Sequence, residues 1–163
     1  MGKIFAPTQE EMMQDEKEHM ELARKLAGEC VVLLENDGVL PLAGAGGRIA
    51  LFGAGARKTV KGGTGSGDVN SRYFVTVEQG LKEAGFTVTS KKWLDAYDAV
   101  RAQAKKAFIA EINAIAKQNK TMPILESMGR VMAEPEYQLP LDAQGDTAIY
   151  VLARNSGEGN DRK

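Results

Sequence analysis

The chain has 163 residues, of which 43% are hydrophobic and 26% charged, and its formal net charge at pH 7 is -1. This length and composition predict one globular domain and exclude a chain that is disordered throughout. The charge gives no basis for binding nucleic acid or an anionic membrane. The single Cys30 cannot form an internal disulfide, which fits a reducing compartment. No signal-peptide core and no run of roughly 20 apolar residues is present, so we expect a cytoplasmic protein.

The first predicted element is a helix over residues 8–36. Thr8 followed by Glu11 is a capping-box pattern at its start. Apolar residues recur at helical spacing and give one broad stripe, at Leu22, Leu26, Cys30 and Leu33. Residues 31–34 are apolar on every side, so a short buried strand is the alternative for this stretch. The sequence Asn-Asp-Gly at residues 36–38 then supplies a stop.

Three short apolar segments have the composition of buried strands: residues 48–52, 86–89 and 147–152. Two segments between them are predicted helices, over residues 75–84 and 94–119. A glycine-rich loop follows the first strand, and residues 120–145, which contain three prolines, are expected to hold little regular structure. Strands alternating with helices favour a parallel sheet with helices on its faces. Only a polar segment follows the third strand, so we expect the sheet to be incomplete in this chain.

The glycine-rich segment at residues 53–70 comes directly after a strand, where α/β folds bind ligands. A dinucleotide-binding fingerprint needs Gly-x-Gly-x-x-Gly, but Lys58 stands at the third glycine position after Gly53 and Gly55. A phosphate-binding loop needs Lys and then Ser or Thr after its last glycine, but Asp-Val follows Gly67. Two other interpretations stay open. One is a flexible surface loop, and the other is a loop whose small residues let the backbone approach a sugar or a neighbouring domain closely.

The polar segment at residues 154–163 follows the third predicted strand at its carboxyl end, again a position where sites form. Glu158 lies between two glycines, which lets its carboxyl project into a cleft as a general acid must. Arg154, Asp161 and Arg162 are near enough in the sequence to pair with one another or to tune that carboxyl. Spacing alone favours the alternative, a solvated polar tail beyond the last strand.

Other polar and aromatic residues give weaker signals. His19 lies among charged residues of the first helix and is expected to be a solvated surface side chain. Trp93 with Tyr97 suits a sugar-stacking platform, but packing at a helix start is the favoured role. No Ser-His-Asp arrangement or metal-binding cluster is apparent, so we expect neither a metal nor any other cofactor.

Three segments, in this order and spacing, resemble the family 3 glycoside hydrolases, the β-glucosidase group. Residues 23–42, ARKLAGECVVLLENDGVLPL, are similar to the start of the family's second domain, with Glu35 in place of the more usual Lys. Residues 49–70 are similar to the family's strand and Gly-Gly-x-Gly-Ser-Gly loop. Residues 151–163, VLARNSGEGNDRK, are similar to its Ser-Gly-Glu-Gly-x-Asp-Arg segment. The resemblance extends over nearly the whole chain, apart from residues 1–20 and 94–145.

The resemblance implies a three-layer α/β sandwich with a mainly parallel sheet, formed by residues 1–163 as a single domain with a helical insertion around residues 94–145. Members pair such a sandwich with a (β/α) barrel that carries an aspartate nucleophile. A chain of 163 residues cannot also hold a barrel of roughly 250. Because family-like sequence begins near Met1, the resemblance implies the subgroup in which the sandwich precedes the barrel. The chain is then expected to be an amino-terminal fragment of its parent protein.

The resemblance also implies a chemistry. The Glu of the Ser-Gly-Glu-Gly motif falls on Glu158, which makes Glu158 the general acid/base of a retaining mechanism, with its carboxyl about 5–5.5 Å from that of the nucleophile. The implied substrate is a terminal β-D-glycoside or oligosaccharide, and the implied partner is the barrel of the same parent protein. Neither nucleic acid nor a membrane is expected to bind. The chain alone is expected to be inactive, because the nucleophile lies on the barrel.

Two alternatives from other functional classes stay open on the sequence. One is a nucleotide- or sugar-binding α/β module. The other is a self-associating domain without catalysis, because the open edge of an unfinished sheet is a template on which two copies pair as a homodimer.

Overall fold

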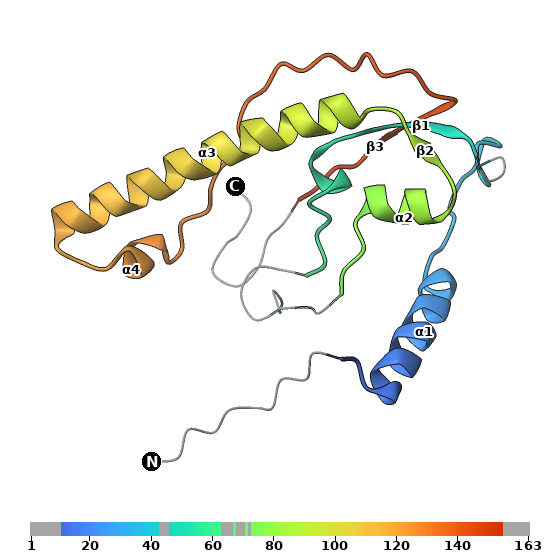
Figure 1. Cartoon of the computed structure of the whole chain (residues 1–163), viewed down its shortest axis with the longest axis horizontal. Coiled ribbons are helices and arrows are strands. Elements are labelled where there is room, and N and C mark those ends of the chain that lie inside the picture. The colour runs from blue at the N-terminus through green and yellow to red at the C-terminus, as the bar shows by residue number, and fades with distance from the viewer. Residues whose placement is uncertain (1–10, 43–45, 63–66, 68–70, 72, 155–163) are drawn as a thin grey trace. The chain divides into compact units, whose positions relative to one another are not determined.

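Figure 1 shows a computed structural model of the chain, in which residues 11–42, 46–62, 67, 71 and 73–154 are described. Contacts within the chain divide it into two compact units, Met1–Leu42 and Ala43–Lys163. In the described ranges, no helix is both long and apolar enough to cross a membrane.

The first unit contains the helix α1 (Gln14–Glu29). Its first turn is closed by Glu16, whose carboxylate accepts a hydrogen bond of 2.8 Å from the backbone N–H of Met13. This hydrogen bond gives a partner to a backbone N–H group that the start of a helix would otherwise leave without one. The predicted helix over residues 8–36 is therefore too long at both ends, and its predicted cap, Thr8, lies outside the described residues.

The apolar stripe predicted for this helix is not buried. Leu22 and Leu26 are 53% and 48% exposed, and no residue of α1 is buried. The helix stops before the apolar run that follows it because Gly28 and the β-branched Val31 and Val32 have low helix propensity. Periodicity in the sequence located the helix but did not indicate what covers its apolar face.

The stretch after α1 has no regular secondary structure. Residues 31–34 are 59–92% exposed, so their interpretation as a buried strand is wrong. The predicted helix stop at residues 36–38 is wrong, because α1 already ends at Glu29. These residues form a local bend instead. The Asn36 side-chain oxygen accepts hydrogen bonds from the N–H groups of Gly38 and Leu40, both at 3.1 Å, and Gly38 has a φ of 96°. Glycine suits this position because other residues are strained at such a φ.

The second unit is built on three parallel strands, β1 (Arg48–Phe52), β2 (Thr87–Val88) and β3 (Thr147–Tyr150). Their order is β2-β1-β3, and β1 is parallel to both neighbours. β1 is buried from Ile49 to Phe52, as a central strand covered on both faces must be. The predicted parallel α/β class and the three predicted strands are confirmed, although β2 is only two residues long.

Helices connect these strands and cover the sheet. Their bounds are α2 Val77–Glu83, α3 Lys91–Asn119 and α4 Pro123–Ser127. In Figure 1, α2 and α3 lie on opposite sides of the strands. α2 and α3 confirm the two predicted helices. α3 begins before residue 94, its predicted start, because Trp93 and Leu94 of its first turn belong to the core and are only 4% and 1% exposed.

An aromatic cluster joins α3 to the sheet. Phe52, at the carboxyl end of β1, meets the Trp93 ring edge-on with 5.4 Å between centroids, and Trp93 stacks on Tyr97 at 5.3 Å. Tyr137 makes edge-on contacts with Trp93 and Tyr97 at 6.0 and 5.1 Å. Each such pair contributes about 0.5–1.5 kcal/mol beyond the area that it buries. The packing role of Trp93 and Tyr97 is confirmed, and a sugar-stacking platform is wrong because both rings are buried.

Residues 128–146, called the strap, return from α4 to β3 without regular secondary structure, as expected (Figure 1). Glu134 fixes the middle of the strap to α3 by accepting a hydrogen bond from the Arg101 guanidinium. At its end, the Asp146 carboxylate accepts a hydrogen bond of 2.8 Å from the Arg48 N–H, and the Asp146 N–H donates to the Arg48 carbonyl at 2.7 Å. The strap therefore sets where β3 begins along β1.

The residue after β1 provides a test of the sheet geometry. Gly53 has a φ of 94°, and a Cβ built on it would lie 2.3 Å from the Val151 carbonyl oxygen. We expect Gly53→Ala to lower the free energy of unfolding by about 2 kcal/mol or more, because it adds backbone strain to a steric clash. Urea unfolding of the chain, followed by the fluorescence of its single tryptophan, measures this change.

Gly80→Ala is the matched control for that substitution. Gly80 lies within α2, and its Cβ would meet Val75 at an ordinary 3.7 Å. Alanine there should stabilise the chain by up to about 1 kcal/mol, because alanine favours helix more than glycine does. Equal effects of the two substitutions would contradict the conformational requirement at Gly53.

Candidate functional site

The order of the strands creates a topological switch point at the carboxyl ends of β1 and β3. The chain leaves β1 through α2 toward β2 on one side, and it returns through α3 to β3 on the other side. Open α/β sheets bind ligands in the crevice outside the carboxyl ends of strands at such a point. The glycine-rich loop and the polar segment that carries Glu158 both start at this edge.

The two segments that leave this edge are in direct backbone contact. The Val151 N–H donates to the Phe52 carbonyl at 2.8 Å, and the Gly55 N–H donates to the Val151 carbonyl at 3.2 Å. Gly55 belongs to a short 3-10 helix, η1 (Ala54–Ala56). A Cβ on Gly55 would lie 2.5 Å from the Val151 side chain. Gly53 and Gly55 therefore permit close approach to the segment after β3. Gly63 and Gly65, further along the glycine-rich loop, lie outside the described residues.

A small pocket of about 180 Å³ lies at the same edge. Its lining comes from η1, α3, the strap, the end of β3 and the segment after β3: Ala54, Tyr97, Glu134, Tyr137, Tyr150, Val151, Leu152, Ala153 and Arg154. The Tyr137 and Tyr150 hydroxyls lie 2.8 Å apart, and this hydrogen bond raises the pKa of Tyr137 to about 12. Burial, followed by a hydrogen bond to Glu134, also raises the pKa of Tyr97. Both phenols are therefore neutral at neutral pH, and the Tyr97 hydroxyl donates to Glu134.

Glu158, Asp161 and Arg162 lie outside the described residues. Arg154 is the last described residue and is exposed beside the pocket, four positions before Glu158 in the sequence. The structure therefore describes the backbone only as far as Arg154, at the carboxyl edge of the sheet, and the role of Glu158 stays a prediction.

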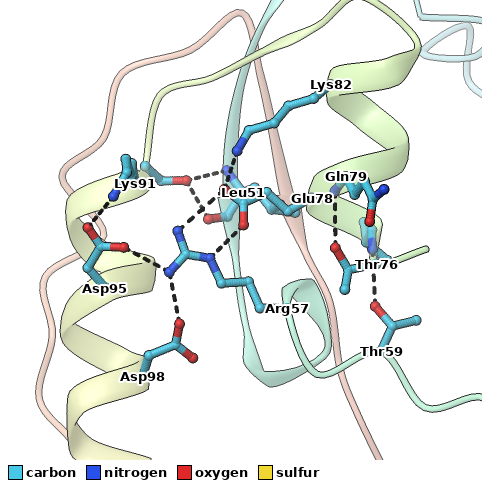
Figure 2. Close-up of polar contacts among 12 residues, drawn as sticks. Leu51, Arg57, Thr59, Thr76, Glu78, Gln79, Lys82, Lys91, Asp95 and Asp98 are labelled. Carbon is cyan, nitrogen blue, oxygen red and sulfur yellow. Dashed lines mark hydrogen bonds and ion pairs between the residues drawn. The ribbon is translucent and has the colours of Figure 1, made fainter. Parts of the chain in front are cut away.

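A second group of side chains, the Arg57 cluster, lies beside this edge (Figure 2). The Arg57 guanidinium contacts Glu78 of α2 at 2.5 Å, and Asp95 and Asp98 of α3 at 2.8 Å each. Two ammonium groups complete the cluster, Lys82 at 2.7 Å from Glu78 and Lys91 at 2.6 Å from Asp95. Three cationic and three anionic side chains thus balance one another.

The electrostatics of the cluster follow from these contacts. The Arg57 guanidinium, hydrogen-bonded to Glu78, holds the pKa of that carboxyl below its ordinary value of 4.5, although burial opposes this effect. The same hydrogen bond raises the pKa of Arg57 above its ordinary value. Lys91, and then Arg57, lower the pKa of the exposed Asp95 carboxyl. Arg57, Glu78 and Asp95 are therefore ionised at neutral pH, and their contacts hold the Arg57 guanidinium in place.

Thr59 fixes the start of the glycine-rich loop from the other direction. Its hydroxyl donates to the Gly55 carbonyl at 2.7 Å and accepts a hydrogen bond of 3.0 Å from the Val77 N–H (Figure 2). η1 is thus tied to the first turn of α2 through Thr59, and to α2 and α3 through Arg57.

Neither the Arg57 cluster nor Tyr137 and Tyr150 of the pocket were found from the sequence. The Arg57 partners lie 21, 38 and 41 residues away, and no spacing rule connects residues so far apart. One signal was present: a charged residue soon after a buried strand must find partners near the core. Tyr150, at the carboxyl end of β3, could have been found in the same way from its place at a strand end.

The start of the glycine-rich loop differs from a dinucleotide-binding motif. The chain after Gly53 forms the three-residue η1 and then a loop, instead of the long helix that a dinucleotide fingerprint opens. His19 is exposed on α1, in agreement with a surface role, and Cys30 is an exposed free thiol. Within the described ranges, no group of three or more His, Cys, Asp or Glu side chains could hold a metal ion.

Fold and site together define a class, an α/β sandwich domain with a binding edge at the carboxyl ends of its parallel strands. Residues 31–163 match the model of the glycosyl hydrolase family 3 C-terminal domain. The chain therefore belongs to glycoside hydrolase family 3, and the matched part is the family's C-terminal domain.

Individual relatives agree with this family. Beta-glucosidase A of Butyrivibrio fibrisolvens is 41% identical over 150 residues, which cover 90% of this chain and 16% of that protein. Probable beta-glucosidase A of Aspergillus niger is 34% identical over 118 residues, or 58% of this chain and 13% of that protein. Beta-glucosidase 3B from Thermotoga neapolitana, solved in complex with glucose, is similar in structure with a TM-score of 0.57 and 33% identity, over 93% of this chain and 20% of that chain. The chain thus spans a fifth or less of the length of these relatives.

The ionised Arg57 cluster predicts a specific acid response. Because the folded pKa of Glu78 is below 4.5, its contribution to stability is fully present above that pH and is lost as the pH falls through the folded pKa. We expect Glu78→Gln to reduce the free energy of unfolding at neutral pH and to flatten its decline in acid. Urea unfolding of the chain at a series of pH values measures both effects.

Asp142→Asn is the matched control, because Asp142 is an exposed acid on the strap. It should keep the acid dependence of the unsubstituted chain. Identical declines in stability below pH 4.5 for Glu78→Gln and the unsubstituted chain would rule out this role of Glu78.

Proposed function

We propose that this chain is the acid/base-bearing part of a retaining β-glycosidase that hydrolyses terminal β-D-glycosides. The observation that carries this proposal is the match of residues 31–163 to the family's C-terminal domain, because this range includes the Ser-Gly-Glu-Gly-Asn-Asp-Arg segment around Glu158. Relatives named as beta-glucosidases, one of them solved with glucose, support a glucoside as the substrate. The position of Val151 at the switch point of the sheet is also consistent with this role.

The proposed reaction divides the chemistry between two parts of the parent protein. An aspartate on a (β/α) barrel attacks the anomeric carbon while the Glu158 carboxyl protonates the departing glycosidic oxygen, so that an ester to the aspartate forms and the aglycone leaves. In the second half, the Glu158 carboxylate takes a proton from water, whose oxygen attacks the same carbon and frees the aspartate. The two carboxyl groups lie about 5–5.5 Å apart in such a mechanism.

The partner in this proposal is the barrel of the same parent protein, in the order in which the sandwich comes first. β3 is an edge strand among the described strands, so its outer edge is open to pairing with another strand. Pairing of two copies through that edge stays a prediction. The nucleotide-binding alternative has weaker support, because η1 stands where a fingerprint helix is required.

Replacement of the proton donor in the intact parent enzyme tests the proposed role. With Glu158→Gln, kcat/KM should fall by about 10²–10⁴-fold for phenyl β-D-glucoside, whose leaving group needs protonation. For 2,4-dinitrophenyl β-D-glucoside, whose leaving group does not, kcat/KM should change little while kcat falls, because deglycosylation loses its base. Azide, which needs no base, should restore kcat and yield β-glucosyl azide.

Glu136→Gln is the control, because Glu136 is an exposed glutamate on the strap. It should leave all these rates unchanged. An equal loss on both substrates for Glu158→Gln, with no rescue by azide, would show that Glu158 does not transfer the proton.

The 163-residue chain by itself should hydrolyse no 2,4-dinitrophenyl β-D-glucoside, because the proposed nucleophile belongs to the barrel. Release of dinitrophenolate, measured against a buffer blank over a range of chain concentrations, tests this. Hydrolysis that rises in proportion to the amount of pure chain would show that the chain contains its own nucleophile. It would contradict the proposal that the acid/base and the nucleophile lie on different parts of the parent protein.

A further inference from the structure

We propose that Arg57 is a positioning residue for the proton-transfer step. By holding η1 between α2 and α3, Arg57 holds the backbone from Val151 to Arg154, which leads into Glu158. This role rests on the proposed function of Glu158. Arg57 is not among the residues that line the pocket.

The first step of the argument is how firmly Arg57 is anchored. Its guanidinium contacts three carboxylates, from Glu78 on α2 and from Asp95 and Asp98 on α3. These two helices lie on opposite sides of the strands, so one planar group spans the carboxyl end of β1 (Figures 1 and 2). Arginine suits this place because its donors form a rigid fork, whereas a lysine ammonium is a single point charge.

The second step is the connection from Arg57 to Val151. Arg57 directly follows Ala56, the last residue of η1, which is 0% exposed. One residue earlier, the Gly55 N–H donates to the Val151 carbonyl at 3.2 Å. A Cβ on Gly55 would meet both the Val151 side chain at 2.5 Å and the Ala153 Cβ at 3.4 Å. Because no space separates these backbones, η1 cannot move without displacing the segment after β3.

The third step is the consequence for chemistry. β3 ends at Tyr150, and Val151 to Arg154 continue without regular secondary structure toward Glu158. A displaced Val151 therefore passes its displacement on to the residues that follow. Proton donation needs heavy atoms about 2.6–3.2 Å apart, and a misplacement of about 1 Å can cost on the order of 10²-fold in rate. Substrates whose leaving group needs no proton are insensitive to that misplacement.

The experiment uses the intact parent enzyme and one derived quantity, the leaving-group ratio. This is kcat/KM for 2,4-dinitrophenyl β-D-glucoside divided by kcat/KM for phenyl β-D-glucoside. Arg57→Met should raise the ratio by about 10–100-fold, and Arg57→Lys should raise it less, because lysine keeps the charge but not the fork. Each rate is corrected for the fraction of active enzyme, titrated by the burst that a 2-deoxy-2-fluoro glucoside releases.

Arg48→Met is the matched control. Arg48 is the first residue of β1, at the end of the strand away from the site. Its guanidinium donates a hydrogen bond to the Gln144 carbonyl at 3.3 Å. Its loss should destabilise the protein without changing the leaving-group ratio. A purely structural role of Arg57 would likewise lower both rates together and leave the ratio unchanged.

The outcomes separate two kinds of failure. If Glu158→Gln raises the ratio and neither Arg57 variant does, the positioning role of Arg57 is wrong and the proposed function stands. If Glu158→Gln itself leaves the ratio unchanged, the proposed function fails. If Arg57→Met yields no titratable enzyme, Arg57→Lys decides the matter, and an unchanged ratio in that variant overturns the proposal.

Discussion

The backbone segments that follow β1 and β3 contact each other at the carboxyl edge of the sheet. The other contacts of the second unit hold these two segments in place. The Gly55 N–H donates to the Val151 carbonyl, and a side chain at Gly53 or Gly55 would occupy space that Val151 already fills. The segments after β1 and β3 therefore move together. The aromatic cluster holds the pair from Phe52, the strap holds β3, and the Arg57 cluster holds η1. The aromatic cluster and the Arg57 cluster act at the carboxyl edge, whereas the contact of Asp146 with Arg48 lies at the amino ends of β3 and β1.

These attachments differ in what they contribute. Full burial of an apolar side chain such as Ile49 or Leu51 stabilises a fold by about 1.5–3 kcal/mol, and the stacked Trp93 and Tyr97 add to this. The ion pairs of Arg57 contribute little net stability, because removing charges from water offsets most of their attraction. Their geometry is nevertheless strict, because three carboxylates must meet one planar group. Stability therefore comes mainly from apolar burial, and the exact direction of η1 comes mainly from the Arg57 cluster.

Periodicity and composition predicted the strands of the second unit and its helices α2 and α3, because local patterns reflect which faces are buried. They did not predict the short helix α4, which lies in a stretch expected to be a loop. β1 was identifiable since the run from Ile49 to Phe52 is apolar and bounded by glycine. The same reasoning failed at residues 31–34, because an apolar run indicates a need for burial and not what covers it. The partners of Arg57 were unpredictable, since they are brought together by the fold alone. Spacing favoured a solvated tail around Glu158, and only the resemblance to a family gave that residue a role.

A catalytic site divided between two parts of a protein places particular demands on each part. The distance between donor and nucleophile combines the positional errors of both sides, and a proton donor tolerates only a few tenths of an ångström. If Glu158 is that donor, its own side of the site must be held locally, before any partner docks. The described structure has such a local hold, in which η1 is tied to α2 by Thr59 and to both α2 and α3 by Arg57. On that proposal, these ties fix the donor's side of the site within one unit, and the remaining variation in the distance between the two carboxyl groups comes from how the partner is placed.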